Sequence, residues 1–275
     1  MLKSFCRAAG LVTAVFVILD GNPATAQTED AINPDRPGIA DGSTVIGRGR
    51  VQVETAFQQE FRGEGASTER RYFLPTLLRG GISDRWEVRV ESNTLTQVDV
   101  RAAGAMNTRT LSLAPVSVGL KFQIQNSTSS RRPSVGTILR VFPASGTGTQ
   151  HTNHATGDLR LAADWDVTST LSLNPNVGVA LYEDDRNHTF TAGLFALTLN
   201  VFNRAKTINP FVDLGVQTPE APASASSVIV DSGVAYLPGR NIQIDVSGGD
   251  GAHGHTPPHP FFSLGMSFRF RPSGG

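Results

Sequence analysis

All six histidines of this sequence fall in segments that we predict to be loops: His151, His154, His188, His253, His255 and His259. The spacing of the first two, and of the last three, would let imidazole nitrogens approach a divalent transition metal. Both loops are rich in Gly or Thr, and no cysteine assists. Solvated loop histidines that titrate near neutral pH are the simpler interpretation, so we expect neither a metal site nor a cofactor.

Asp184, Asp185 and His188 form the one cluster that could contribute to hydrolysis. A hydrolase needs a nucleophile, a base and a group that orients the base, all within hydrogen-bonding reach. The sequence places no serine elbow, metal signature or phosphate-binding glycine loop beside this cluster. We therefore predict that the protein is not an enzyme and has no catalytic residue.

A larger set of charged side chains alternates with apolar residues, and this period of two predicts strands with one polar and one apolar face. At the midplane of a membrane, an Arg or Lys facing lipid would cost about 2 to 4 kcal/mol. We therefore expect the charged set to line the interior of a barrel: Glu54, Glu87, Arg89, Glu91, Lys121, Arg140, Arg160, Asp164, Asp213, Asp231, Asp245 and Arg269. Two interpretations stay open. The charges form a pore wall that screens solutes, or they pair across a narrow barrel and fill it.

The elements that must position these residues are predicted by the same alternation. In residues 50–61, RVQVETAFQQEF, the valines and phenylalanines point one way and the Gln and Glu residues mostly the other. The pattern predicts twelve strands, at residues 50–61, 69–80, 85–93, 113–125, 133–142, 157–167, 170–182, 189–201, 207–217, 227–237, 240–248 and 260–270. The expected fold class is all-β: a transmembrane antiparallel up-and-down β-barrel of about twelve strands, with short periplasmic turns and longer extracellular loops.

The connections and the aromatic residues support this topology. Five connections are short, whereas those at 94–112, 143–156, 219–226 and 249–259 are longer, and the loop 94–112 is a candidate to narrow the pore. Barrels carry aromatic girdles at both membrane interfaces. We expect one girdle at the periplasmic rim, Trp86, Trp165, Tyr236 and Phe268, and one at the outer rim, Phe61, Tyr72, Phe142, Tyr182, Phe190 and Phe262.

The amino terminus predicts export. Lys3 and Arg7 precede an apolar run at residues 8–19, and an A-x-A site follows at 24–26, so residues 1–26 are a predicted signal peptide. Residues 27–49 contain two prolines and several glycines and form either a periplasmic lead-in or a plug. Arg36 is the plug candidate, because a guanidinium among Glu54, Glu87 and Glu91 could pin the segment. The barrel then spans residues 50–270, and residues 271–275 form a C-terminal tail.

The composition excludes some partners. The chain has 24 basic and 24 acidic residues, which become 22 and 23 when Lys3, Arg7 and Asp20 leave with the signal peptide. This balance gives no electrostatic reason to expect nucleic acid as a partner. A hydrophobic fraction of 39% suits a barrel in which every second strand residue faces lipid.

Two stretches carry a family resemblance: NPDRPGIADGSTVIGRGRVQVETAF at 33–57 and LPTLLRGGISDRWEVRVES at 74–92. The D-R-P motif, the Gly-x-x-x-x-Glu run into the first strand and the P-T-L-L-R-x-G-x-x-D-R hairpin resemble a bacterial family of outer-membrane transporters linked to the phenol meta-degradation pathway. The resemblance implies a barrel and a transport role. One departure is the carboxyl end: barrel proteins commonly end on an aromatic residue, whereas here five residues follow Phe270.

These observations predict an exported protein of the Gram-negative outer membrane. We expect a porin-like channel that passes small solutes, with aromatic-degradation substrates as candidates, by passive diffusion through a mixed-charge lumen. The alternative is a non-transporting structural or surface barrel with a packed interior. The expected partners are outer-membrane lipids, a small-molecule solute and the barrel assembly machinery.

Overall fold

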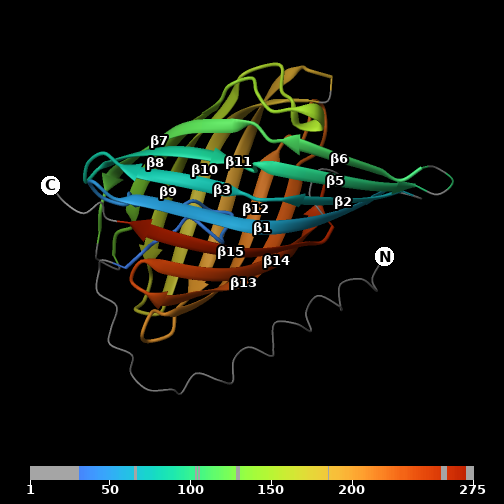
Figure 1. Cartoon of the computed structure of the whole chain (residues 1–275). Coiled ribbons are helices and arrows are strands. Elements are labelled where there is room, and N and C mark those ends of the chain that lie inside the picture. The colour runs from blue at the N-terminus through green and yellow to red at the C-terminus, as the bar shows by residue number, and fades with distance from the viewer. Residues whose placement is uncertain are drawn as a thin grey trace.

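The computed structural model describes residues 31–64, 67–102, 104, 106–127, 131–184, 186–254 and 259–270, which fold almost entirely as β-strands (Figure 1). The first seven strands are β1 (Val51–Glu64), β2 (Ser67–Phe73), β3 (Thr76–Gly81), β4 (Trp86–Ser92), β5 (Leu95–Ala102), β6 (Thr108–Leu113) and β7 (Val116–Gln125). The next eight are β8 (Ser134–Phe142), β9 (Thr156–Asp166), β10 (Leu171–Glu183), β11 (Thr189–Val201), β12 (Ile208–Thr218), β13 (Ser227–Gly239), β14 (Ile242–His253) and β15 (Phe261–Phe270). A 3-10 turn, η2 (Gly148–Gln150), follows β8.

Twelve of these strands close into a barrel. Each pairs antiparallel with its neighbours in the order β1, β3, β4 and then β7 through β15. The last strand returns to the first, so that Val51 lies opposite Phe270 and Glu60 opposite Phe261. The expected twelve-stranded antiparallel barrel is confirmed. We call the end that carries the short turns periplasmic and the other end outer, as in outer-membrane barrels.

Alternation along the strands separates an apolar outer wall from a polar interior. On β7, Val118 is 57% exposed, whereas the side chains of Ser117 and Lys121 are buried. The same reversal of an ordinary globular core recurs around the barrel, since most large exposed side chains on the strands are Val, Leu, Ile or Phe. An apolar exterior whose backbone groups pair between neighbouring strands suits a barrel that crosses lipid.

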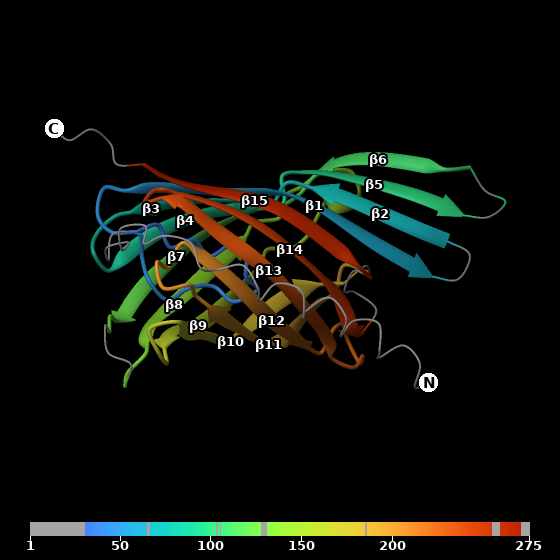
Figure 2. The ribbon, with the colours of Figure 1, turned by 90° about the horizontal axis from the view of Figure 1, so that it is seen from below.

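Strands β2, β5 and β6 continue β3, β4 and β7 beyond the barrel. Two of the three breaks contain a proline, Pro75 between β2 and β3 and Pro115 between β6 and β7, and proline cannot donate to the strand ladder. Together with residues 58–64 of β1 they form a four-stranded sheet, which we call the outer sheet, in the order β1, β2, β5, β6. It projects from the outer end of the barrel, as Figures 1 and 2 show.

The outer sheet corrects one prediction. Residues 94–112 are not a loop that narrows the pore, because most of them form β5 and β6 outside the barrel. The sequence there, LTQVDVRA, does alternate, and Thr96 and Val98 are buried on one face. The many Ala, Thr and Asn residues nearby hid this pattern.

The aromatic girdles are only partly as expected. Trp86, Trp165, Tyr236 and Phe262 are exposed on the lipid-facing surface of the barrel. Tyr182, in contrast, lies on the inner face, because Leu181 takes the lipid side at 42% exposure. Phe190 lies 5.9 Å from Tyr182, ring to ring, and Phe142 also lines the interior. The prediction used the position along each strand and neglected which face each residue occupies.

The predicted signal peptide and the C-terminal tail lie outside the described residues. Within the part of the chain that the structure describes, no helix is long and apolar enough to cross a membrane.

Exposure of Val118 in the middle of β7 gives a test of the lipid face. We expect Val118→Arg to cost about 2 to 4 kcal/mol, because the charge would lie near the lipid midplane. Leu111→Arg, on the outer sheet at 61% exposure, should cost far less. Folding yield in lipid vesicles, read by the heat-dependent shift in gel mobility, measures both. Equal loss from the two variants would contradict the assigned membrane position.

Candidate functional site: a charged lumen crossed by the amino-terminal segment

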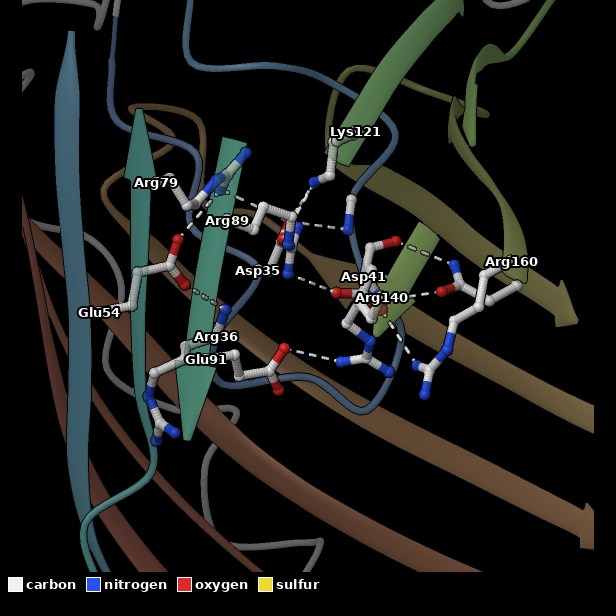
Figure 3. A network of polar contacts seen from close by, with 12 residues as sticks. Asp35, Arg36, Asp41, Glu54, Arg79, Arg89, Glu91, Lys121, Arg140 and Arg160 are labelled. Atoms are coloured by element: carbon white, nitrogen blue, oxygen red, sulfur yellow. Dashed lines mark hydrogen bonds and ion pairs between the residues drawn. The ribbon is translucent and has the colours of Figure 1, made fainter. Parts of the chain in front are cut away.

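Residues 31–50, the amino-terminal segment, enter and leave the lumen at the periplasmic end. The Ile32 N–H donates to the carbonyl of Arg240 at 2.7 Å, and the Gly49 N–H donates to that of Gly81 at 2.9 Å. Between these anchors the segment runs among the inward-facing side chains of the barrel (Figure 3). It therefore lies inside the barrel rather than below it.

Asp35 is the charged centre of this segment. Its carboxylate accepts hydrogen bonds from Lys121 Nζ at 2.9 and 3.0 Å and from Arg89, and it lies 3.5 Å from Arg79. Burial raises the pKa of the Asp35 carboxyl, but the three cationic side chains lower it more, so the net pKa lies well below its ordinary value. Asp35 is thus an ionised anchor held by cations from β3, β4 and β7.

Asp41 makes a second anchor, which Arg89 shares with Asp35. Arg89 and Arg160 each donate to its carboxylate at 3.0 Å. Its backbone forms a two-way pair with Asn176 on β10, at 2.9 Å in each direction. Burial raises the pKa of Asp41, and the neighbouring guanidinium groups overcome this and lower it. The segment is therefore tied to β4, β9 and β10 as well.

Carboxylates of the wall also bind the backbone of the segment. An irregular buried segment has no ladder for its N–H groups, so other acceptors must satisfy them. Four of the predicted lumen residues do this, at 2.9 to 3.1 Å: Glu54 accepts from Arg36 N, Asp213 from Ile39 N, Asp164 from Ser43 N and Glu87 from Ile46 N. The wall carboxylates thus satisfy backbone N–H groups of the segment that would otherwise be buried without a partner.

Arg36 has different partners from those expected. Its guanidinium donates to Asp245 at 3.1 Å and to Ser263 at 3.0 Å, on β14 and β15. Of the three expected glutamates, only Glu54 contacts it, and only through the Arg36 backbone. Glu87 and Glu91 are engaged by other arginines, because Arg79 and Arg140 lie nearer to them.

Most of the remaining wall charges form ion pairs with one another. Arg79 contacts Glu54 at 3.0 Å and Glu87 at 2.7 Å. In the outer half, Arg140 bridges Glu91 at 2.8 Å and Asp158 at 2.7 Å, and Arg160 also reaches Asp158 at 3.2 Å. Asp231 lies opposite Asp213 across β12 and β13, and Arg269 donates to the Ala31 carbonyl at the periplasmic end. Each of Arg79, Arg89, Lys121, Arg140 and Arg160 thus has a carboxylate partner, so these five cations set no unopposed positive field.

Sequence reasoning missed Arg79, Asp158, Asp35 and Asp41 as members of this network. Arg79 follows the exposed Leu78 on β3 and so lies inward by parity, and Asp158 alternates with Leu159 in the same way. The strand alternation could therefore have predicted the inward position of Arg79 and Asp158. The two aspartates lie in an irregular segment, where no periodicity assigns a side chain to a face.

Glycines on the wall leave the space that the segment occupies. A side chain at Gly136 on β8 would overlap the Ser43 carbonyl, and a Cβ at Gly265 on β15 would lie 2.6 Å from Arg36 Nη2. At Gly136 the obstacle is backbone, so this position admits the segment only as glycine, whereas at Gly265 the Arg36 side chain would have to shift.

A cavity of about 510 Å³ lies above the segment in the outer half of the lumen. Asp35, Gly38, Ile39 and Asp41 form its floor, and its walls carry Glu91, Arg140, Asp158, Arg160, Phe142 and Tyr182, among others. A recess of about 180 Å³ lies beside it, and its lining includes the apolar Ile39, Leu194, Ala196 and Ile229 as well as the polar Arg160, Asn176, Gln217 and Ser227. The lumen was expected to be polar, but the wall formed by β11 to β13 is partly apolar.

The described loop residues form no comparable site. The Asp184 carboxylate accepts hydrogen bonds from the backbone of His188 and Arg186, which lower its pKa and weaken it as a base. His154 pairs with Glu183 and His259 with Asp250. Asp185 and His255 lie outside the described residues. Among the residues that are described, no group of three or more His, Cys, Asp or Glu side chains is placed to hold a metal.

Comparison with known structures places the fold among outer-membrane barrels. An outer-membrane channel from Pseudomonas putida F1 superposes with a TM-score of 0.61 at 11% identity, over 85% of this chain and 99% of that chain. The β domain of the Bordetella autotransporter Brka gives a TM-score of 0.54 at 16% identity, over 81% of this chain and 100% of that one. Such low identities show a shared fold alone. No curated protein matches the sequence.

A family model matches residues 34–270, which include most of the amino-terminal segment and the whole barrel. The match begins one residue before the D-R-P motif, whose Asp35 and Arg36 lie at the centre of the lumen network. The resemblance expected from the sequence is confirmed. Because the match spans most of the chain, the protein belongs to the family described as "Putative MetA-pathway of phenol degradation".

Proposed function

We propose that this protein is an outer-membrane channel for small solutes that the amino-terminal segment closes as a plug. Solutes enter the cavity from the outer end and diffuse through the mixed-charge lumen when the segment moves. The observation that carries the proposal is the cavity of about 510 Å³ whose floor is the segment itself. Export by the signal peptide and insertion by the barrel assembly machinery belong to the same proposal.

The contacts of the plug suit a reversible closure. They are ion pairs and hydrogen bonds, and no strand of the barrel includes the segment. Each such contact exchanges for water when the segment leaves, so the net free energy of each is small compared with its strength in isolation. Displacement of the segment therefore leaves the barrel ladder intact.

The lining of the cavity supports a proposal for the class of solute. Its volume lies in the range of sites for small organic molecules. Carboxylates and guanidinium groups surround the polar part, while Phe142, Tyr182 and the recess at Leu194 and Ile229 offer apolar contact. This combination fits small amphiphilic solutes. The family description adds aromatic-degradation substrates as the candidates to test first.

The alternative function is a structural barrel that transports nothing. The pairing of the lumen charges and the path of the segment across the lumen favour it. Planar-bilayer recording of the purified protein discriminates the two, with liposome uptake of benzoate and of a sugar of similar size as a second measurement. We expect discrete, infrequent current steps and solute uptake. If a folded barrel shows no current and no uptake, the proposed channel function is contradicted.

Charge removal in the cavity should change ion selectivity. Arg140→Gln with Arg160→Gln leaves Asp41, Asp158 and Glu91 with less compensation, and fixed charge is poorly screened in a narrow path with low-dielectric walls. We expect the reversal potential under a salt gradient to shift in the direction that reports a higher ratio of cation to anion permeability. Arg204→Gln, exposed in a periplasmic turn, is the control and should leave it unchanged. A shift of equal size from the control would contradict the assignment.

A further inference from the structure

The outer sheet continues the membrane-facing wall of the barrel on one of its two faces. β1 runs without interruption from Val51 to Glu64, so Phe57 and Phe61 share the outward side with Val51. Along one edge of β1, the pairing with β3 passes over to β2 with no register shift, since Thr55 lies opposite Thr76 and Gln58 opposite Phe73. The outward face of the outer sheet is therefore the direct extension of the lipid face.

Residues on this face change character with distance from the barrel. The first row carries Phe57, Leu95 and Leu113, each more than 40% exposed. In the next row Tyr72 lies between two glutamines, and its ring stacks on Phe57 with the centroids 6.2 Å apart. Leu111 completes that row on β6. At a membrane interface, apolar residues face the acyl chains and tyrosines lie next to them at the level of the head groups, which is the order seen on this face.

Arginines follow directly above the tyrosine row. Arg70, Asp99 and Arg109 lie side by side on β2, β5 and β6. The Arg70 guanidinium lies 5.4 Å from the centroid of Phe61, and Arg109 Nε lies 3.0 Å from Asp99. Arg101 is one row farther out on β5. All three arginines are exposed, and they face one carboxylate, which leaves an excess of two positive charges.

The opposite face of the same sheet carries no such excess. Arg62 pairs with Glu60 at 3.0 Å, and Arg71 pairs with Glu69, each within a single strand. The cationic excess is therefore confined to the side that continues the lipid face. The position of these arginines along the membrane normal also fits the head-group region. Phe57 and Phe61 are four residues apart, which is about 13 Å along a strand and carries the surface from acyl chains to head groups.

We propose that the outward face of the outer sheet binds the phosphate groups of lipid A in the outer leaflet. Phosphate is the anion expected just beyond the acyl chains, and a guanidinium fork binds it with two parallel hydrogen bonds. Lipid A carries two phosphates on a rigid disaccharide, which suits arginines on three neighbouring strands. The apolar row at Leu95 and Leu113 meets its acyl chains. The surface thus combines charge complementarity with continuity to the membrane-facing wall.

Binding of defined lipids to the purified barrel in detergent tests this inference. The lipids are bisphosphorylated lipid A, its dephosphorylated form and phosphatidylglycerol, and native mass spectrometry counts the bound molecules. The variant Arg70→Gln, Arg101→Gln, Arg109→Gln removes the cations of the outward face. The matched control Arg62→Gln, Arg71→Gln removes two arginines from the other face. A heat-dependent shift in gel mobility confirms that each variant is folded.

We expect the native protein to retain bisphosphorylated lipid A over the other two lipids. An arginine near an anionic membrane surface changes affinity about fivefold, so the triple variant should lose at least tenfold. The control should stay within twofold of the native protein. Equal binding of dephosphorylated lipid A, equal binding of phosphatidylglycerol, or equal losses in the two variants would each overturn the proposal.

Discussion

Asp35→Asn is expected to raise the time-averaged conductance of the barrel at least tenfold. The substitution keeps the size of the side chain and removes the charge that Arg79, Arg89 and Lys121 share. Removing one partner of a buried ion pair costs about 3 to 5 kcal/mol, because the remaining charges stay buried without compensation. About 3 kcal/mol corresponds to roughly a hundredfold change in an equilibrium constant. The segment should therefore leave the lumen much more often.

Planar-bilayer recording and liposome uptake measure this change. Asp99→Asn is the matched control, since Asp99 pairs with an exposed arginine on the outer sheet and an exposed ion pair is worth little. A second variant, Gly136→Leu, places a side chain where the Ser43 carbonyl lies and displaces the segment without altering charge. Both should open the pore while the control stays native. If folded Asp35→Asn and Gly136→Leu barrels both conduct as the native protein does, the segment is not a gate.

The barrel could be predicted from the sequence because one face of every strand meets lipid. A side-chain period of two, read along β1 or β7, assigns each residue to a face, and a register error would place charges such as Lys121 in lipid. The inward position of the twelve predicted lumen residues on the strands follows from the same parity. What each of them contacts does not, because partners such as Arg140 and Glu91 lie on strands that are distant in sequence.

The path of the amino-terminal segment could not be predicted in this way. It has no periodicity, and its hydrogen bonds join it to wall residues 18 to 238 positions away. Arg36 attracted notice because several glutamates were expected in the lumen. Those glutamates form ion pairs with Arg79 and Arg140. Asp35 instead is the residue of the segment that contacts several cationic side chains. Only a count of all the inward charges, including those missed, would have indicated this.

A disulfide between the plug and the wall is expected to abolish opening. A Cβ built at Gly38 lies 3.0 Å from Thr198 Oγ1 on β11, and the φ angle of Gly38 lies outside the left-handed region. Sulfurs at both positions therefore lie within reach of a bond of about 2.05 Å. The one native cysteine, Cys6, lies in the predicted signal peptide, so Gly38→Cys, Thr198→Cys would be the only thiols of the processed protein.

The crosslink is most informative in the Asp35→Asn background. Oxidised, the triple variant should fall below the conductance of the native barrel, because a covalent tether at the apex of the segment prevents its exit whatever the charge at position 35. Reduction with dithiothreitol should restore the high conductance within the same membrane. Either single cysteine, treated identically, should not respond. A high conductance that survives complete oxidation, verified by thiol counting, would mean that solutes pass beside a stationary segment and that Asp35 sets the charge of the path rather than its closure.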